Sequence, residues 1–146
     1  MTIDDSFTVE APVERVWALL TDIPKVATCI PNAEITEVVD EKTYRAKVSV
    51  KVGPVSVGYK ATIHVEQLDD STHTAAFRIQ GDELRGRGGV KAAVTSRAVP
   101  EDGKTRVNLR ADAQISGIIA SVGGRLIESV AKKTISEFAA NLAKLL

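Results

Sequence analysis

The sequence is poor in the residues that carry most site chemistry. Its 146 residues include one cysteine, one tryptophan, two tyrosines, three phenylalanines and two histidines. A lone cysteine, Cys29, excludes an internal disulfide and fits a reducing compartment. No apolar run approaches the length of a membrane-spanning helix, and the N-terminus is polar and acidic rather than a cationic and apolar signal segment. These absences predict a soluble, cytoplasmic protein without a transmembrane segment.

Neither sign of charge predominates. Lys plus Arg and Asp plus Glu each number 19, a balance that does not favour nucleic acid as a partner. The distribution is uneven, because residues 1–41 carry nine acids and two bases whereas residues 42–146 carry ten acids and seventeen bases. With 44 % hydrophobic and 26 % charged residues, the chain is expected to form one globular domain over residues 1–146 with a core of its own.

The stretch from Ile118 to Leu146 has the periodicity of a long amphipathic helix. Apolar residues recur at every third or fourth position, with polar residues between them. The apolar stripe comprises Ile119, Val122, Leu126, Val130, Phe138, Leu142 and Leu145. Gly123 and Gly124 fall within the first turns, where they weaken the helix or let another backbone approach closely. A helix of roughly 25 residues is about 38 Å long, so a broad sheet is needed to cover it.

The rest of the chain predicts such a sheet. Residues 1–10 alternate as one strand, and helical spacing follows over residues 13–20 and 24–31. Residues 35–39 predict a weaker strand, and residues 44–115 alternate through five strands separated by turns. The predicted fold is α+β, with a curved antiparallel sheet of about seven strands wrapped around the long C-terminal helix and two short helices after the first strand.

Four segments resemble one known family. They are the opening APVERVWALLTDIPKVATCIPNAE, the turn VKVGPV, the loop ELRGRGG and the helix GGRLIESVAKK. Together they resemble the CoxG proteins of carbon monoxide dehydrogenase, which belong to the START-like (SRPBCC) superfamily of helix-grip folds. The resemblance implies a hydrophobic cavity between the long helix and the sheet. It also implies association with a molybdenum hydroxylase-type partner enzyme.

The residues themselves leave two interpretations of the interior open. Small side chains such as Ala61, Ala92 and Ala111 fall on the strand faces that should meet the helix, and they leave either empty volume or close helix packing. If the interior is a cavity, its predicted lining is Trp17, Ile30, Tyr59, Ala61, Phe77, Ala92, Val94, Leu109, Ala111, Val122, Leu126 and Val130. The loop at residues 85–89 would lie at its rim, and the Tyr59 hydroxyl could hydrogen-bond the carbonyl of a quinone-like ligand.

Two functions follow from this interior. The first is a non-catalytic accessory protein that binds a lipid- or quinone-like molecule without a cofactor and assists a partner enzyme. The alternative is a small cyclase- or hydrolase-type enzyme, which needs acid or base groups in the cavity. The inward positions supply only Tyr59 and Tyr44 as polar groups, and Cys29 has no base at a usable position, so it is interpreted as a small buried hydrophobe.

The remaining polar motifs predict no metal or nucleotide site. His64 and His73 lack metal partners at usable spacing and are predicted at the surface. The glycine-rich stretch over residues 81–89 lacks the Lys-Ser/Thr of a phosphate-binding loop. A set of basic residues is predicted on the outer face of the sheet, where they aid solubility or steer an acidic partner or an anionic membrane surface. This set is Arg45, Lys47, Lys51, Lys60, Arg78, Lys91, Arg97, Arg106 and Arg110. The exposed helix face and the sheet edge leave a homodimer open.

Overall fold

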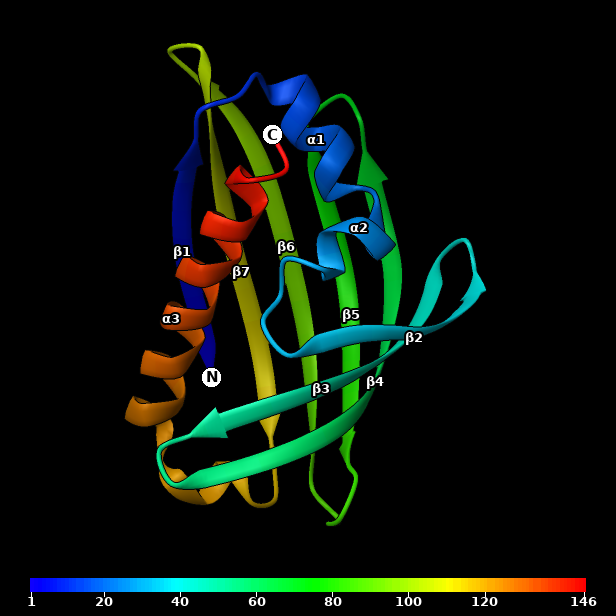
Figure 1. Cartoon of the computed structure of the whole chain (residues 1–146), viewed down its shortest axis with the longest axis vertical. Coiled ribbons are helices and arrows are strands. Elements are labelled where there is room, and N and C mark those ends of the chain that lie inside the picture. The colour runs from blue at the N-terminus through cyan, green and yellow to red at the C-terminus, as the bar shows by residue number, and fades with distance from the viewer.

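The computed structural model describes residues 1–146 as a curved seven-stranded sheet with helices on its inner side (Figure 1). The strands are β1 (Thr2–Val9), β2 (Ala33–Asp40), β3 (Thr43–Val52), β4 (Val55–Asp69), β5 (Thr74–Glu83), β6 (Gly89–Glu101) and β7 (Lys104–Ile115). Their order across the sheet is β1-β7-β6-β5-β4-β3-β2, and every neighbouring pair is antiparallel. In Figure 1, β2 and β3 cross in front of the long central strands, so the sheet curls around its inner face.

The helices confirm the predicted element order. Two short helices, α1 (Val13–Leu20) and α2 (Ile23–Ala27), follow the first strand and close the upper end of the sheet in Figure 1. Asp22 caps α2, because its side chain accepts a hydrogen bond from the Lys25 backbone N–H at 3.3 Å. Pro24 lies in the first turn of α2, where its missing N–H has no helical partner to lose.

The C-terminal α-helix begins later in the structure than the sequence predicted. Residues Ile119–Val122 form a separate 3-10 turn, η1, and the α-helix α3 runs over Gly124–Ala143, which is 20 residues. Gly123 separates them with a φ of 94°, a left-handed backbone conformation that glycine adopts without steric cost. The prediction of one continuous helix from Ile118 was wrong. The spacing of apolar residues continues without interruption across Gly123, although the helical backbone does not.

The apolar stripe of α3 is buried unevenly. Leu142, near its C-terminal end, is fully buried, whereas Leu126 near its start is 37 % exposed. The closest backbone approaches of α3 to the sheet are to β1, at one edge, and to β3. The helix therefore lies along one side of the curved sheet and is not sealed within it.

The buried residues form three separate clusters rather than one continuous core. The cluster at the α1 end includes Val16, Leu19, Val107 and Leu142. A second cluster contains Val52, Val57, Tyr59 and Ile119. A third cluster, beside α2, contains Ile23, Tyr44 and Val65. The middle of the inner sheet face lies between these three packed regions.

Candidate ligand-binding site

Small apolar side chains occupy the middle of the inner face. Strand register places Ala92 between Ile79 and Ala113, and Val94 between Phe77 and Ala111. All six residues belong to the inward-facing rows, yet each of their side chains is only half-buried. Ala92, Val94 and Ala111 also lie outside the three packed clusters. The centre of the inner face is thus apolar, and its side chains stay partly exposed.

Tyr59 brings a polar group to one end of this apolar face. The residue is 4 % exposed, and its hydroxyl has no hydrogen-bond partner. Its ring lies over Gly81 on the neighbouring strand, where an added Cβ would be 3.6 Å from the Tyr59 Cδ1 atom. Burial raises the pKa of the Tyr59 hydroxyl, and the Glu83 charge raises it further. The phenol is therefore a neutral, unused hydrogen-bond donor at physiological pH.

Glu83 is a buried carboxylate that pairs with Tyr59 in the strand register. Its Oε1 accepts a hydrogen bond from the Gly88 N–H at 3.1 Å, and its Oε2 accepts one from the Ile118 N–H at 2.9 Å. The carboxylate thereby joins the β5–β6 connection to the segment that precedes η1. Two backbone donors compensate part of the cost of burying the charge, and no cation pairs with it.

The prediction that only tyrosines are polar on the inner face was wrong. Glu83, Ser96 and Thr105 are also buried there, and Asp5 is half-buried in the inward row of β1. Thr105 donates to the Ala11 carbonyl at 2.7 Å, whereas the Ser96 hydroxyl has no partner. The sequence could have shown that Glu83 points inward. Alternate residues of a strand face the same side, and Glu83 continues the inward series of Ile79 and Gly81, but this segment was interpreted as a loop.

Trp17 and its neighbours lie at the α1 end. The Trp17 Nε1–H donates to Asp70 Oδ1 at 2.8 Å, and its indole lies 5.5 Å from the His73 ring between centroids. His73 lies in the β4–β5 turn, as predicted, and is partly covered, whereas His64 is exposed. Ile30 is half-buried just beyond α2. The polar atom of Trp17 is already satisfied, so this residue can offer a ligand its apolar ring only.

Neither the Cys29 thiol nor the Tyr44 hydroxyl is available for catalysis or ligand binding. Cys29 is buried in the α1-end cluster, and desolvation raises the pKa of its thiol, which disfavours the nucleophilic thiolate. Its backbone carbonyl accepts a hydrogen bond from the Asn141 side chain at 3.0 Å. The Tyr44 hydroxyl donates to the Glu41 carbonyl at 3.3 Å. Tyr59 therefore differs from Tyr44 in having a buried hydroxyl without a partner.

The structure brings only part of the predicted lining together. Val122 and Val130 pack against the cluster that contains Tyr59. Ala61 is buried, Phe77 packs against the cluster beside α2, and Leu109 packs against the α1-end cluster. Leu126 lies at the periphery, 37 % exposed and against the turn at Gly53. The predicted residues thus span the length of the inner face rather than one compact pocket.

The outer face of the sheet carries two surface depressions. They are shallow grooves of ≈ 560 Å³ and ≈ 310 Å³ that run over β5, β6 and β7. Their shared side chains are Gln80, Lys91 and Gln114. The predicted outward basic residues are all exposed, and several are paired with acids, as Arg78 is with Glu66. Of the predicted lining residues, only Ala92 borders these grooves.

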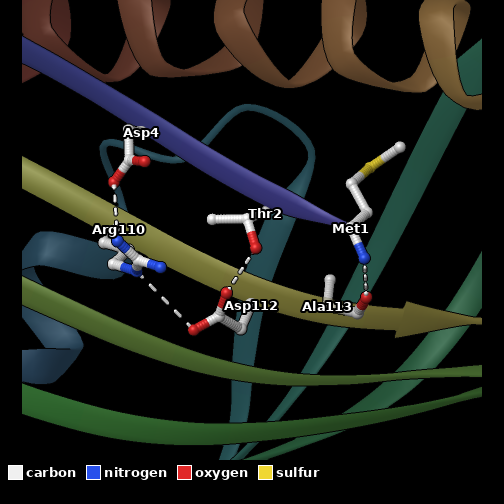
Figure 2. Close-up of polar contacts among 6 residues, drawn as sticks. All are labelled: Met1, Thr2, Asp4, Arg110, Asp112 and Ala113. Atoms are coloured by element: carbon white, nitrogen blue, oxygen red, sulfur yellow. Dashed lines mark hydrogen bonds and ion pairs between the residues drawn. The ribbon is translucent and has the colours of Figure 1, made fainter.

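Polar contacts across β1 and β7 rim the larger groove (Figure 2). The N-terminal amine of Met1 donates to the Ala113 carbonyl at 3.0 Å, and the Thr2 hydroxyl donates to Asp112 Oδ1 at 2.6 Å. Arg110 lies between two carboxylates, 3.8 Å from Asp4 and 3.7 Å from Asp112. The Thr2 hydrogen bond lowers the pKa of Asp112. These contacts hold the first strand to the last, so they have a structural role.

Comparison with known proteins places the chain in a family. Residues 6–146 match the family model of CoxG, the G component of carbon monoxide dehydrogenase. The chain belongs to the CoxG family. This confirms the resemblance carried by the four sequence segments. No curated protein matches the chain.

Solved structures show the same fold. A conserved protein from Geobacillus kaustophilus is 25 % identical with a TM-score of 0.87, and the match covers 99 % of this chain and 93 % of that one. A START superfamily protein from Mycobacterium smegmatis is 16 % identical with a TM-score of 0.67, over 98 % and 94 % of the two chains. An aromatase/cyclase from Streptomyces sp. R1128 is 17 % identical with a TM-score of 0.67, over 99 % and 92 %. This CoxG-family chain therefore has the START-like helix-grip fold.

Two further structural facts bear on site chemistry. No group of three or more His, Cys, Asp or Glu side chains is placed to hold a metal ion. No helix combines the length and the apolar character needed to cross a membrane. On the inner face, the described side chains offer apolar contact and hydrogen bonding from the unpartnered Tyr59 and Ser96 hydroxyls.

Proposed function

We propose that this CoxG-family protein binds a hydrophobic, carbonyl-bearing molecule of lipid- or quinone-like chemistry on the inner face of its sheet. The observation that carries the proposal is the Tyr59 hydroxyl, which is buried and without a partner on the sheet face that also carries a strip of partly exposed apolar side chains. Buried polar groups in folded proteins are normally paired, and an unpaired one costs about 1–3 kcal/mol. A ligand carbonyl would remove that cost by accepting from the phenol.

The apolar part of the ligand would supply most of the affinity. Covering apolar surface contributes roughly 25 cal/mol per Å², and the inward rows offer a continuous strip of alanine, valine and isoleucine side chains. The proposed contacts are Tyr59, Val122 and Val130 at one end and Ala92, Val94 and Ala111 along the strip, with Ala61, Phe77 and Leu109 beside it. Trp17 and Ile30 would meet the far end of a long ligand, and Leu126 would lie at the entrance.

The proposed role is that of a non-catalytic accessory protein. The family takes its name from carbon monoxide dehydrogenase, so we infer that the partner is an enzyme of this molybdenum hydroxylase type. A single domain over residues 1–146 and a cytoplasmic location stay predictions, as does the homodimer. The identity of the ligand is part of what the binding experiment must determine.

One observation favours a second function. Tyr59 and the buried Glu83 are cross-strand neighbours, which gives the inner face a phenol beside a carboxylate. Such a pair can serve a cyclase- or hydrolase-type enzyme as acid and base. Both Glu83 oxygens already accept backbone hydrogen bonds, and this arrangement favours the structural role.

A matched pair of tyrosine variants tests the binding proposal. Native mass spectrometry and calorimetric titration with a short-chain ubiquinone should show one bound molecule for the unaltered protein. Tyr59→Phe should weaken binding about 5- to 10-fold, the value of one hydrogen bond of about 1 kcal/mol or slightly more. Tyr44→Phe removes a hydroxyl that is satisfied within the protein, so it should leave the affinity unchanged.

A pair of alanine variants tests the location. Ala92→Phe places a ring on the inner face and should abolish binding, whereas Ala93→Phe places the same ring on the outer face and should not. Binding that survives both Tyr59→Phe and Ala92→Phe would contradict the proposed site. Turnover of a bound ester that Glu83→Gln abolishes would instead support the enzyme function.

A further inference from the structure

A second buried hydroxyl on the inner face lacks a hydrogen-bond partner. Ser96 on β6 is 6 % exposed, and its Oγ atom shares with the Tyr59 hydroxyl the lack of any partner among the buried side-chain polar atoms. Buried polar groups in folded proteins are normally paired, so an unpaired one indicates a contact that the free protein does not make. The proposed ligand uses the Tyr59 hydroxyl, and the Ser96 hydroxyl is left over.

Ser96 lies where the half-buried apolar strip meets the packed α1 end. Side chains two residues apart on a strand point to the same face, so Ser96 continues the inward row of Ala92 and Val94. The next residue in that row, Ala98, belongs to the α1-end cluster. Strand register pairs Ser96 with Leu109, which packs against the same cluster. The Ser96 hydroxyl therefore marks the α1 end of the strip.

The two unpartnered hydroxyls lie at opposite ends of the strip. The Tyr59 ring lies over Gly81, and the register partner of Gly81 on β6 is Val90. Ser96 follows Val90 by six residues on β6, which runs along the sheet between β5 and β7 (Figure 1). At about 3.3 Å per residue, six residues span roughly 20 Å. A molecule that reaches both hydroxyls is therefore elongated, apolar in its middle and polar at each end.

The charge near Ser96 discriminates between the polar groups that such a molecule could carry. Asp5 is half-buried and lies in the same cross-strand row, because Asp5 and Ser96 pair with Leu109 from its two sides. Two strand spacings separate the backbones of Asp5 and Ser96 by roughly 10 Å. Asp5 takes part in no ion pair. Its negative charge opposes a carboxylate beside Ser96 and leaves a neutral hydroxyl unaffected.

We propose that Ser96 binds the distal hydroxyl of an elongated lipid whose carbonyl end is held by Tyr59. This inference rests on the proposed ligand binding and deepens it, since it specifies a long-chain carbonyl compound with a neutral polar group at its far end. A serine hydroxyl both donates and accepts, so it can pair with a ligand hydroxyl in either role.

The stability of the ligand-free protein is the first test. Ser96→Ala removes a hydroxyl without a partner and leaves an apolar side chain, so the Tm should stay unchanged or rise. Thr105→Val removes a buried hydroxyl that donates to Ala11 and should lower the Tm by about 2–4 °C. An equal fall in Tm for Ser96→Ala would show that this hydroxyl has a partner within the protein, and it would overturn the inference.

Calorimetric titration with matched esters tests the contact itself. Methyl ω-hydroxypalmitate and methyl palmitate differ only in the terminal hydroxyl. Ser96→Ala should weaken binding of the hydroxylated ester about 5- to 10-fold, the value of one hydrogen bond, and leave binding of methyl palmitate unchanged. Ser56→Ala, which removes an exposed hydroxyl from the outer face of β4, should change neither affinity. An unchanged affinity of Ser96→Ala for the hydroxylated ester would overturn the inference.

A third ester, with a terminal carboxylate in place of the hydroxyl, tests the ligand class. It should bind more weakly than the hydroxylated ester. Asp5→Asn should reduce this difference, whereas Asp4→Asn, on the outer face beside Arg110, should not. Equal affinities for the two esters in the unaltered protein would overturn the assignment of a neutral group.

The same titrations separate this inference from the proposed function. Tyr59→Phe should weaken binding of all three esters. If none of them binds, or if Tyr59→Phe has no effect, the proposed function fails and this inference fails with it. Binding that depends on Tyr59 but not on Ser96 would refute the Ser96 contact alone.

Discussion

The two ends of the molecule differ in how completely their side chains are satisfied. At the α1 end, Leu142 is fully buried, Thr105 donates to Ala11, and the Trp17 N–H is held by Asp70. Toward the opposite end, the Tyr59 hydroxyl has no partner, and Arg85, Arg87 and Arg125 take part in no ion pair. Packing is therefore tightest at the α1 end, and the buried Tyr59 and Ser96 hydroxyls on the inner face are left without partners.

The largest effect is expected at the α1 end. Leu142→Ala removes a fully buried side chain from the cluster that joins α3 to α1 and β7, and it should lower the free energy of unfolding by about 2–5 kcal/mol. Leu145→Ala, three residues away and 44 % exposed, should change it by about 0.5 kcal/mol or less. Urea denaturation followed by circular dichroism measures both. An equal decrease in the free energy of unfolding for both variants would contradict the conclusion that Leu142 is packed and Leu145 is not.

A smaller, localised effect is expected from Glu83. Glu83→Gln replaces one acceptor oxygen by an amide NH₂ group, which cannot accept from the Gly88 or Ile118 N–H, and should cost about 1–3 kcal/mol. Hydrogen exchange should accelerate at Gly88 and Ile118 and remain slow in α1. Glu66→Gln breaks an exposed pair with Arg78 and should cost at most about 1 kcal/mol. An equal increase in hydrogen-exchange rate at Gly88, Ile118 and α1 would argue against a local stabilising role for Glu83.

The smallest effect is expected at the seam between β1 and β7. The Thr2 hydroxyl lowers the pKa of Asp112, so the folded protein holds this proton less tightly than the unfolded chain. Stability from this contact is therefore present above the ordinary carboxyl pKa and is lost as the pH falls through the lowered value. Thr2→Val should raise the pKa of Asp112 toward its ordinary range in an NMR titration. Thr8→Val, with no such contact, should leave it unaltered, and equal shifts would contradict the assignment.

Most of the fold could be predicted because its signals are local. Alternation over residues 44–115 identified the strands, and proline and helical spacing identified the two short helices. The start of the long helix was missed because hydrophobic periodicity continues from Ile119 across Gly123, and only the backbone conformation shows the break. The family resemblance rested on whole segments, and its confirmation over residues 6–146 agrees with the predicted order of elements.

The candidate site could be predicted only in part. Strand parity places Tyr59, Ala92 and Val94 on the inner face, but it says nothing of what covers them. Glu83 was missed because a glycine-rich segment was interpreted as loop from Gly81 onward, although β5 continues to Glu83. The uneven burial of α3 could not be foreseen either, since its stripe is apolar at both ends.

The sequence by itself determined the element types, the inward and outward faces, and the family, since all of these depend on residues close together in the chain. Only the tertiary structure decided which polar groups find partners. The carboxylate of Glu83 meets the N–H of Ile118 across 35 positions, while the Tyr59 hydroxyl meets no acceptor. Whether a polar group finds a partner depends on how segments distant in sequence pack together. The groups that find none are the ones available to bind a ligand.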